Sequence, residues 1–436
     1  RYFMKYKKYP SYKDSGVEWL GEIPSDWNES RLKFIGYTYG GLSGKAGKDF
    51  GDEENLKSKR FIPFTNIANN TFIKSDNLGY VIVDEKEEQN RVKANDLFFL
   101  MSSENYDDLG KASLLEEDLK DTYLNSFCKG FRLTNKLINP KFLNYLLSGN
   151  IYRKLLSIQG NGFTRINLRL EKLNELKLLL PNLREQQQIV NFLDKATAKI
   201  DTLIEKQTKQ IELLKEKRQA VISHAVTKGI NPNVPMKDSG VEWLGEIPEH
   251  WITPKLIYIS SRIGDGLHST PLYEDNTGFY FINGNNLING NILFRNTSKE
   301  VSELEYVKHF IRLDSNSLLL SINGTIGNVA LYNDEKIILG KSAAYINCLK
   351  KMNREFLLFY LQSNCAKRYY DIEVTGTTIF NLSLNSIRKM NIALPPYLEQ
   401  HQIIRYCREM QFKYNTLIQK SNKSIELLKE KRTALI

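Results

Sequence analysis

Residues 185–226 read EQQQIVNFLDKATAKIDTLIEKQTKQIELLKEKRQAVISHAV and contain neither glycine nor proline. Their apolar residues recur at alternating spacings of three and four, which is typical of a coiled-coil seam. Pro181 precedes the stretch and Gly229 and Pro232 follow it, so both ends carry residues that favour helix starts and stops. The stretch therefore predicts one long helix. Its seam residues are Ile189, Leu193, Ala196, Ile200, Leu203 or Ile204, Ile211, Leu214 and Val221.

A second copy of this helix begins near residue 399, which is 214 positions after the first. A single helix with one apolar stripe has no surface against which to bury it, so we expect the two copies to pack on each other in antiparallel order. At about 1.5 Å per residue, they would form a rod of roughly 60 Å that spaces the other domains. Gln207 and Ser421 occupy matching seam positions, where polar side chains can fix the register. The copied pieces are IELLKEKR at 211–218 and 425–432, and LP…EQ…I at 180–189 and 394–403.

The duplication extends over the whole chain. KDSGVEWLGEIP occurs at 13–24 and, letter for letter, at 237–248. Between the copied pieces, residues 25–160 and 249–374 differ in length and in most letters. The chain therefore consists of a variable block and a constant block, each present twice. Where the blocks join, Gly162, Thr164, Asn167 and Leu168 align with Gly376, Thr378, Asn381 and Leu382.

Short β-rich runs fill the variable blocks, between Gly, Asn and Asp residues that favour turns. Each block ends in a helical stretch, at 140–156 and at 354–370. We therefore expect an α+β fold, in which two α/β domains are separated by two long antiparallel helices and related by an internal pseudo-two-fold repeat. The expected strands lie at 61–64, 80–83, 96–102, 279–282 and 317–322. The expected domains are residues 1–180 and 237–394, the first long-helix spacer is 181–236, and the second long helix is 395–436.

The composition excludes several classes of protein. With 41% hydrophobic residues, the 436-residue chain can bury substantial cores and is not of the disordered class. The formal charge of +11 favours a polyanionic partner, although many basic proteins bind no nucleic acid. The four cysteines form no CxxC pair, which argues against a disulfide framework or a zinc site. No apolar run reaches the roughly 18 residues of a membrane helix and the start lacks a signal-peptide core, so we expect a cytoplasmic protein without membrane contact.

Several segments stand out beside the LP…EQ…I helix openings. They are GGLSGK at 40–45, FFLMSSENYDDLG at 98–110, DGLHSTPLY at 265–273, SINGTIGNVAL at 321–331 and TGTTIFNLSL at 375–384. In these segments and in its repeat plan, the chain resembles the specificity subunits of type I restriction-modification systems over residues 13–436. The resemblance implies that each variable block is a target-recognition domain for one half of a split double-stranded DNA site.

The same resemblance implies the partners. They are two methyltransferase (modification) subunits, which carry S-adenosylmethionine and act on adenine, and restriction (motor-nuclease) subunits, which use ATP and Mg. This chain is expected to bind none of these cofactors itself. In agreement, the sequence has no D-P-P-[YF] or N-P-P-[YF] methyltransferase motif, no GxxxxGK[ST] phosphate loop and no GxSxG elbow. We therefore expect a DNA-recognition subunit without catalytic residues or a metal site.

Three other interpretations remain open from the sequence. The chain could be a stand-alone two-domain DNA-binding regulator with no enzyme partner. It could be an enzyme that acts on nucleic acid unaided, or a coiled-coil scaffold whose positive charge is incidental. Copurification of a methyltransferase, activity of the isolated chain, and salt-dependent DNA binding distinguish these cases.

A protein that reads DNA needs side chains that pair with base edges, chiefly Arg and Lys for guanine and Asn and Gln for adenine. Polar loops of both variable blocks offer them, although many of the same Asn and Gly residues could serve in turns only. His268 has no second metal ligand at a suitable spacing, so we expect it to contact a phosphate or a base. The expected DNA contacts are Ser43, Lys45, Lys48, Thr65, Asn66, Ser102, Ser103, Tyr106, Asn161, Thr164, Arg165, Arg262, Asp265, His268, Ser269, Thr270, Asn283, Asn285, Asn323, Thr325, Thr377 and Thr378, with Lys45, Lys48, Arg165, Arg262, His268 and Asn285 foremost.

The four tryptophans, Trp19, Trp27, Trp243 and Trp251, lie in or beside the copied segments. A copied residue cannot easily encode two different half-sites. We therefore interpret these side chains as packing anchors rather than as stacking platforms for bases. By the same logic, the copied segments are expected to give a symmetric pair of partner subunits two equivalent seats.

Overall fold

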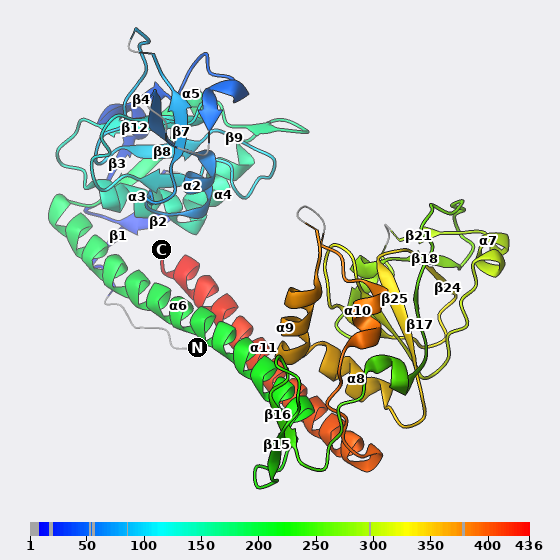
Figure 1. The fold of residues 1–436 in the computed structure, drawn as a ribbon. Coiled ribbons are helices and arrows are strands. Elements are labelled where there is room, and N and C mark those ends of the chain that lie inside the picture. Colours follow the sequence, from blue (N-terminus) through cyan, green and yellow to red (C-terminus); the bar gives the residue numbers. More distant parts are fainter. Residues whose placement is uncertain are drawn as a thin grey trace. The chain divides into compact units, whose positions relative to one another are not determined.

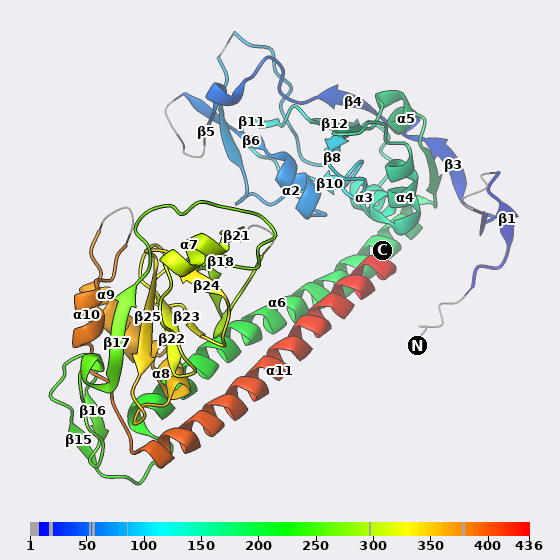
Figure 2. The same cartoon turned by 90° about the vertical axis from the view of Figure 1, so that its right-hand side faces the viewer.

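The computed structural model describes residues 8–16, 21–51, 54, 57–84, 86–295, 298–376 and 380–436 of the chain. These residues belong to two compact units. Unit 1 comprises the residues up to Lys206 together with Ile425–Ile436, and unit 2 comprises Gln207–Ser424. Each unit contains one α/β domain and a part of both long helices, α6 (Leu183–Lys228) and α11 (Tyr397–Leu435) (Figures 1 and 2). The division thus falls within the helices, because each part of a helix packs on its own domain, and not at the domain boundaries expected from the sequence.

Unit 1 is built around an antiparallel sheet of order β10-β8-β12-β4, beside a second sheet of order β11-β6-β7-β5. Ile62, Phe98 and Leu124 fill the core between the two sheets. All four residues of β8 are buried, as expected of a central strand. The strands are β4 (Gly36–Gly40), β5 (Phe50–Gly51), β6 (Ser58–Ile62), β7 (Gly79–Ile82), β8 (Leu97–Leu100), β10 (Ala112–Leu114), β11 (Thr122–Leu124) and β12 (Cys128–Leu133), with the two-stranded pairs β1 (Tyr12–Asp14) and β2 (Glu22–Pro24), β3 (Asn28–Arg31) and β14 (Lys177–Leu180), and β9 (Ser102–Ser103) and β13 (Ile166–Asn167). The helices are α1 (Leu32–Ile35), α2 (Phe64–Asn69), α3 (Pro140–Ser148), α4 (Asn150–Ile158), α5 (Leu170–Asn174) and the 3-10 turn η1 (Gly47–Asp49).

Unit 2 repeats this plan. Its main sheet has the order β17-β25-β22-β23, and a second sheet has the order β21-β18-β24. All six residues of β25 are buried. The strands are β17 (Ser260–Asp265), β18 (Tyr280–Ile282), β21 (Lys299–Glu300), β22 (Ser317–Ser321), β23 (Val329–Leu331), β24 (Ile337–Leu339) and β25 (Ala343–Cys348), with the pairs β15 (Met236–Asp238) and β16 (Glu246–Pro248), and β19 (Leu287–Ile288) and β20 (Asn291–Ile292). The helices are α7 (Glu303–Lys308), α8 (Arg354–Leu361), α9 (Asn364–Glu373), α10 (Leu384–Lys389) and the 3-10 turns η2 (Leu256–Ile259) and η3 (Gly284–Asn286).

Most of the expected strands are present, as β7, β8, β18 and β22. The strand expected at 61–64 was half wrong, because β6 ends at Ile62 and α2 begins at Phe64. Each expected helix at the end of a variable block is two helices. Gly149 has extended backbone (ψ 147°) and separates α3 from α4, and the hydroxyl of Ser363 caps α9 by accepting from the backbone N–H of Ala366.

In unit 1, the first turns of α6 pack against the last turns of α11. Leu435 and Ile436 pack on the core that contains Leu193. Arg432 forms an ion pair with Asp201, with Nε 2.9 Å from Oδ1. Residue numbers thus rise along α6 as they fall along α11. The helices are antiparallel within this unit, as expected.

In unit 2, the last turns of α6 pack against the first turns of α11. Ile222 shares a core with Ile403 and Cys407, and Arg218 donates a hydrogen bond to the side-chain oxygen of Asn415. The direction is again antiparallel. None of the described helices is both long and apolar enough to cross a lipid bilayer.

The copied LP…EQ…I motif attaches the start of each long helix to its own domain through hydrogen bonds. Gln186 is buried, and its side chain accepts from the backbone N–H of Asn139 (2.8 Å) and donates to the carbonyls of Leu137 (3.2 Å) and Pro181 (2.8 Å). Gln400 makes the equivalent three bonds in unit 2. A buried amide whose donors and acceptor are all engaged fixes the geometry of the helix start, which explains why the motif is repeated.

The glutamate of the same motif holds a tryptophan. Glu185 accepts from the indole N–H of Trp27, and Glu399 accepts from that of Trp251, both at 3.2 Å. Trp251 is fully buried. Both residues are packing anchors, as expected from their place beside the copied segments, whereas Trp19 lies outside the described residues.

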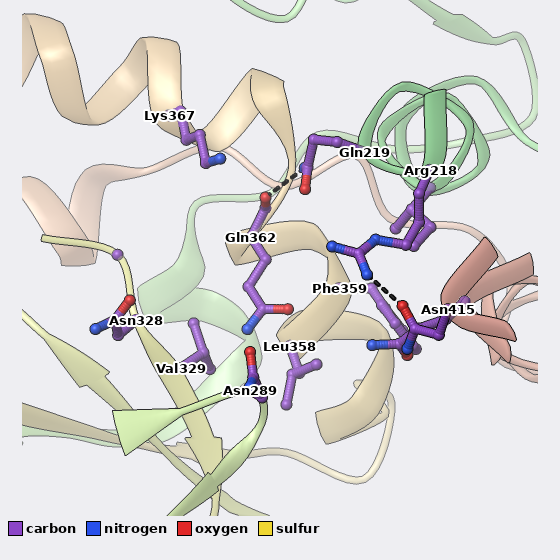
Figure 3. Close-up of a pocket in the computed structure, with 13 residues that line it drawn as sticks. Arg218, Gln219, Asn289, Asn328, Val329, Leu358, Phe359, Gln362, Lys367 and Asn415 are labelled. Carbon is purple, nitrogen blue, oxygen red and sulfur yellow. Dashed lines mark hydrogen bonds between the residues drawn. The ribbon is translucent and has the colours of Figure 1, made fainter. Parts of the chain in front are cut away.

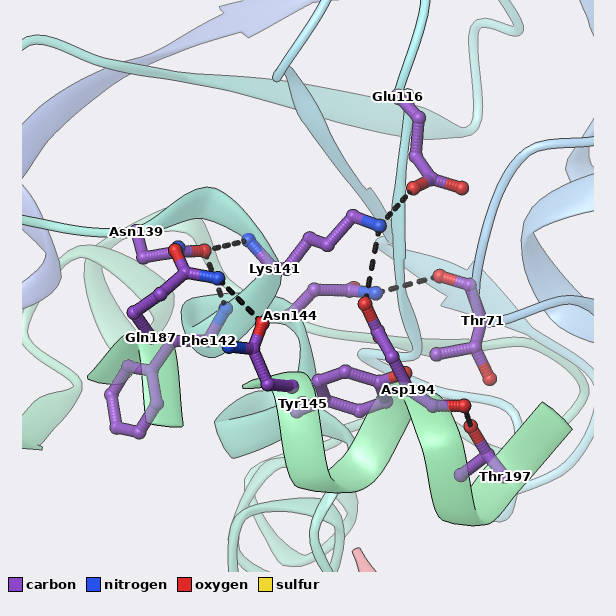
Figure 4. A network of polar contacts seen from close by, with 11 residues as sticks. Thr71, Glu116, Asn139, Lys141, Phe142, Asn144, Tyr145, Gln187, Asp194 and Thr197 are labelled. Atoms are coloured by element: carbon purple, nitrogen blue, oxygen red, sulfur yellow. Dashed lines mark hydrogen bonds and ion pairs between the residues drawn. The ribbon is translucent and has the colours of Figure 1, made fainter. Parts of the chain in front are cut away.

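Outside this motif, each domain also contacts its long helix through an ion pair, and the two ion pairs have their charges reversed. In unit 1, Lys141 of α3 lies 2.5 Å from a carboxylate oxygen of Glu116 and 3.4 Å from one of Asp194 on α6 (Figure 4). At the equivalent positions of unit 2, Glu355 of α8 pairs with Arg408 of α11. The cation thus lies on the domain in one unit and on the long helix in the other.

Candidate nucleic-acid interface

Several loops of unit 2 meet at one end of its main sheet, where β17 and β22 end and β25 begins. The backbone N–H of Leu267 donates to the carbonyl of Leu339 (2.7 Å), and that of Gly340 donates to Ile282 (2.8 Å). These two bonds join the loop after β17 to the turn between β24 and β25, and that turn to the loop after β18. Residues separated by 72 and by 58 positions are thereby brought together.

The same turn also contacts two further polar loops, and a third polar loop joins the cluster through one of them. The hydroxyl of Ser342 donates to the side-chain oxygen of Asn283 (2.9 Å), and its carbonyl accepts from Ile322 (3.0 Å). The backbone N–H of Gly324 donates to the carbonyl of Phe380 (3.0 Å). We call the described residues of 266–270, 283–286, 322–325, 340–342, 375–376 and 380–381 the loop cluster of unit 2.

Unit 1 contains the same backbone frame. The N–H of Leu42 donates to Leu124 (2.7 Å), and that of Asn125 donates to Ile62 (3.1 Å). The backbone N–H of Met101 donates to the carbonyl of Phe127 (3.1 Å), as that of Ile322 does to Ser342 in unit 2. The N–H of Leu168 donates to the carbonyl of Met101 (2.8 Å), as that of Leu382 does to Ile322 (2.8 Å). The loop cluster of unit 1 therefore comprises 41–48, 63–66, 101–106, 125–127 and 160–167. The two clusters share a frame and differ in most of their exposed side chains.

One glycine in each unit lies directly against the backbone of this frame. A Cβ atom on Gly41 would lie 2.1 Å from the carbonyl oxygen of Asn125, and one on Gly266 would lie 2.1 Å from that of Leu339. These distances leave no room for a side chain. The close approach of each glycine is to the protein's own backbone.

Most of the expected contacts in unit 1 are exposed on its loop cluster. Arg165 lies over the ring of Phe127, with its guanidinium carbon 4.6 Å from the ring centroid. Together with Ser102, Ser103 and Phe64 they line a pocket of about 260 Å³. The other exposed members are Ser43, Lys48, Thr65, Tyr106, Asn161 and Thr164.

Two expectations for unit 1 need correction. Asn66 is fully buried, and its amide donates to the carbonyls of Lys74 (2.9 Å) and Asn77 (2.6 Å), so it stabilises a turn and does not face a ligand. The side chain of Lys45 is only 8% exposed, and its ammonium lies 2.6 Å from Glu87. This hydrogen bond lowers the pKa of Glu87 below its usual value. A DNA contact by Lys45 would have to break this ion pair. The structure therefore does not support Lys45 as one of the foremost DNA contacts.

In unit 2, the exposed expected residues are Arg262, His268, Ser269, Thr270, Asn285 and Thr325. Arg262 lies over the ring of Tyr345 at 5.7 Å, and a ring nitrogen of His268 is 2.8 Å from Asp265. Asn283 and Asn323 have structural contacts, because Asn283 accepts from Ser342 and Asn323 forms a β-bridge with Asn381. Thr377 and Thr378 lie outside the described residues.

Sequence reasoning missed two exposed side chains of the clusters. Lys341 is exposed between Gly340 and Ser342, in the turn that binds the other loops of unit 2. Phe163 is 107% exposed at the tip of the 161–165 loop of unit 1. An exposed aromatic ring among polar loops suits stacking on a base. No periodicity marks either position, and alignment of LGKSA at 339–343 with LNSFC at 124–128 was the signal that could have identified Lys341.

Known proteins resemble both halves of the chain. The sequence matches the type I restriction modification DNA specificity domain family over residues 24–213 and again over 266–427. A Methanocaldococcus jannaschii chain named for the MjaX specificity subunit of a type I restriction enzyme is 27% identical over 431 residues, covering 93% of each chain. The EcoKI specificity subunit of Escherichia coli strain K12 is 23% identical over 414 residues, covering 92% of this chain and 85% of the other.

Solved structures share the fold. A chain from a study of complex assembly and conformational transition of the type I R-M system has a TM-score of 0.68 at 16% identity, covering 95% of this chain and 97% of that chain. The HsdS subunit from Thermoanaerobacter tengcongensis has a TM-score of 0.51, also at 16% identity, covering 95% and 96%. The family match covers most of the sequence, with one match in each half. The chain therefore belongs to the type I restriction modification DNA specificity domain family, as a specificity subunit.

Proposed function

We propose that the two loop clusters each read one half of a split double-stranded DNA target, and that the chain itself performs no catalysis. The observation that carries this proposal is the shared backbone frame with different side chains in the two clusters. A common frame presents both clusters in the same way, while unlike side chains specify unlike sequences. Family membership does not favour a stand-alone regulator.

We further propose that the copied faces of the long helices seat two methyltransferase subunits. Lys215, Glu216 and Lys217 of α6 are exposed, as are the identical residues 429–431 of α11. Identical exposed surfaces suit identical partners. S-adenosylmethionine would then be bound by the methyltransferases, and ATP and Mg by restriction subunits where these join the complex, while the paired helices set the spacing between the half-sites.

Domain exchange tests the division of labour. Replacing residues 32–165 by the matching segment of a foreign specificity subunit keeps β3 with its partner β14 and should change one half of the methylated sequence only. Methylome sequencing of a host that expresses the exchanged chain with its methyltransferase provides the measurement. The exchange of 260–381 is the matched control and should change the other half. A change in both halves, or in neither, from a single exchange would contradict the proposal.

Lys341 provides a residue-level test of the loop cluster of unit 2. Lys341→Gln should weaken DNA binding and reduce the slope of log affinity against log salt by about 0.9, which is the value for one lost phosphate contact. Lys350→Gln is the control, because this exposed lysine follows β25 at the opposite end of the strand. Equal slopes for both variants would show that the cluster does not face DNA. Binding is measured by fluorescence anisotropy at several salt concentrations.

A further inference from the structure

Unit 2 contains a polar cleft that neither DNA reading nor the proposed seats use. Its volume is about 640 Å³. It lies between α6, α11, the junction of α8 and α9, and the loops at 289 and 327–329. Figure 3 shows the polar ends of Arg218, Gln362 and Asn289 turned toward a common space, with Lys367 at its rim. None of the described residues that line the cleft is Asp or Glu.

The positive charges of the cleft are not neutralised within the described part of the chain. Arg218 donates to the side-chain oxygen of Asn415, which is a neutral amide. Neither Arg218 nor Lys367 has a carboxylate within ion-pair distance among the described residues. Asn328, Gln362 and Gln411 add further side-chain amides to the lining. The cleft thus combines two cations with several hydrogen-bond donors.

The equivalent residues of unit 1 carry a neutralised charge. Arg432 is the copy of Arg218, and Asp201 is the copy of Asn415. In unit 1 the guanidinium is paired with the carboxylate at 2.9 Å and 3.4 Å. A single difference, Asn for Asp, therefore leaves the arginine of unit 2 unpaired with an anion while retaining its hydrogen bond and its place.

The second cation differs between the units in the same sense. Arg153 of unit 1 is the copy of Lys367, and it is largely enclosed, with Nη2 donating to the carbonyls of Asp107 and Leu109, both at 2.8 Å. Burial lowers the pKa of Arg153. Lys367, in contrast, is exposed to the cleft. Both differences increase the positive charge that is available in unit 2.

We propose that this cleft binds a phosphate group, with Arg218 and Lys367 supplying the charge and the amides of Gln362, Asn289 and Asn328 supplying further hydrogen bonds. Asn415 accepts from Nη1 of Arg218, so the other N–H groups of the guanidinium are available to an anion. The remaining donors come from several directions. A tetrahedral phosphate group, whose terminal oxygens point in different directions, accepts hydrogen bonds from such an arrangement.

The phosphate has two possible sources, the DNA backbone and a small phosphorylated molecule. The DNA source rests on the proposed function, and it would add a contact that carries no sequence information. The small-molecule source does not depend on that function. The two sources require separate measurements on the same variant.

Asn415→Asp restores the ion pair of unit 1 and is the decisive substitution. It should weaken the binding of inorganic phosphate, followed by phosphorus NMR or calorimetry, by about tenfold, because a carboxylate then competes for Arg218. If DNA supplies the phosphate, the salt slope of DNA binding should instead fall by about 0.9 with an unchanged recognised sequence. Lys350→Gln is again the control, since Lys350 is exposed and does not line the cleft. Because Asn415→Asp adds an ion pair, the thermal unfolding midpoint should not decrease.

Either loss supports the proposal and identifies the source. Phosphate binding and salt slope that both match those of Lys350→Gln would overturn it, as would loss of methyltransferase copurification alone, which would assign the cleft to an acidic protein segment. Failure of the proposed function gives a different result. In that case the unaltered chain would show no sequence-specific DNA binding, whereas failure of this inference leaves such binding intact.

Discussion

Gln400→Ala is expected to lower the free energy of unfolding by about 3 kcal/mol, because each buried backbone group left without its partner costs about 1–3 kcal/mol. Gln400 is fully buried. Its side-chain oxygen accepts from the N–H of Asn353 (2.8 Å), and its amide donates to the carbonyls of Lys351 (3.0 Å) and Pro395 (3.1 Å). Alanine removes all three bonds and leaves a cavity at the junction of α8 and α11.

Gln402→Ala is the matched control, since Gln402 lies on the exposed side of the same helix turn. It should change stability by no more than about 0.5 kcal/mol. Thermal or urea unfolding of both variants provides the measurement, with circular dichroism as the signal. Equal midpoints for the two variants would show that the copied EQ pair is not a structural brace, and its repetition would then require another explanation.

The sequence predicted the fold to the extent that the fold depends on repetition and periodicity. The paired helices, their antiparallel direction and the two α/β domains follow from the seam and from the copied segments. The break at Gly149 was missed, because a helical composition on both sides concealed a glycine with extended backbone. The start of α2 at Phe64 was missed as well, since an aromatic run after a strand favours more strand.

The candidate interface was predicted as a set of loops better than as a set of residues. The loops at 266–270, 283–286 and 322–325 do meet, as their polar and Gly-rich composition suggested. Individual residues depend on which way a side chain points. Thr65 and Asn66 are neighbours in one loop, yet Thr65 is exposed and Asn66 is fully buried. Lys45 pairs with Glu87, which is 42 positions away, and no local pattern predicts that contact.

Gly41→Ala is expected to disrupt the loop cluster of unit 1 and, with it, the reading of one half-site. The added Cβ atom would lie 2.1 Å from the carbonyl oxygen of Asn125 and 2.8 Å from that of Leu124. Both are backbone atoms of the frame, since Leu124 accepts from Leu42 and Asn125 donates to Ile62. No rotation of a flexible side chain relieves such a clash. We expect a loss of about 3 kcal/mol in the free energy of unfolding, at the upper end of the usual cost of overpacking.

Gly47→Ala separates this steric effect from the general effect of replacing a glycine. A Cβ atom on Gly47 would meet nothing within 4 Å, and its backbone does not have positive φ. This control should retain the unaltered stability within about 0.5 kcal/mol. DNA binding is measured on the full target and on targets with either half scrambled. Gly41→Ala should lose discrimination at one half by at least about tenfold, which corresponds to about 1.4 kcal/mol, while keeping discrimination at the other. If its discrimination and unfolding midpoint equal those of Gly47→Ala, the backbone frame does not position the reading loops, and the equivalence of the two clusters has no functional meaning.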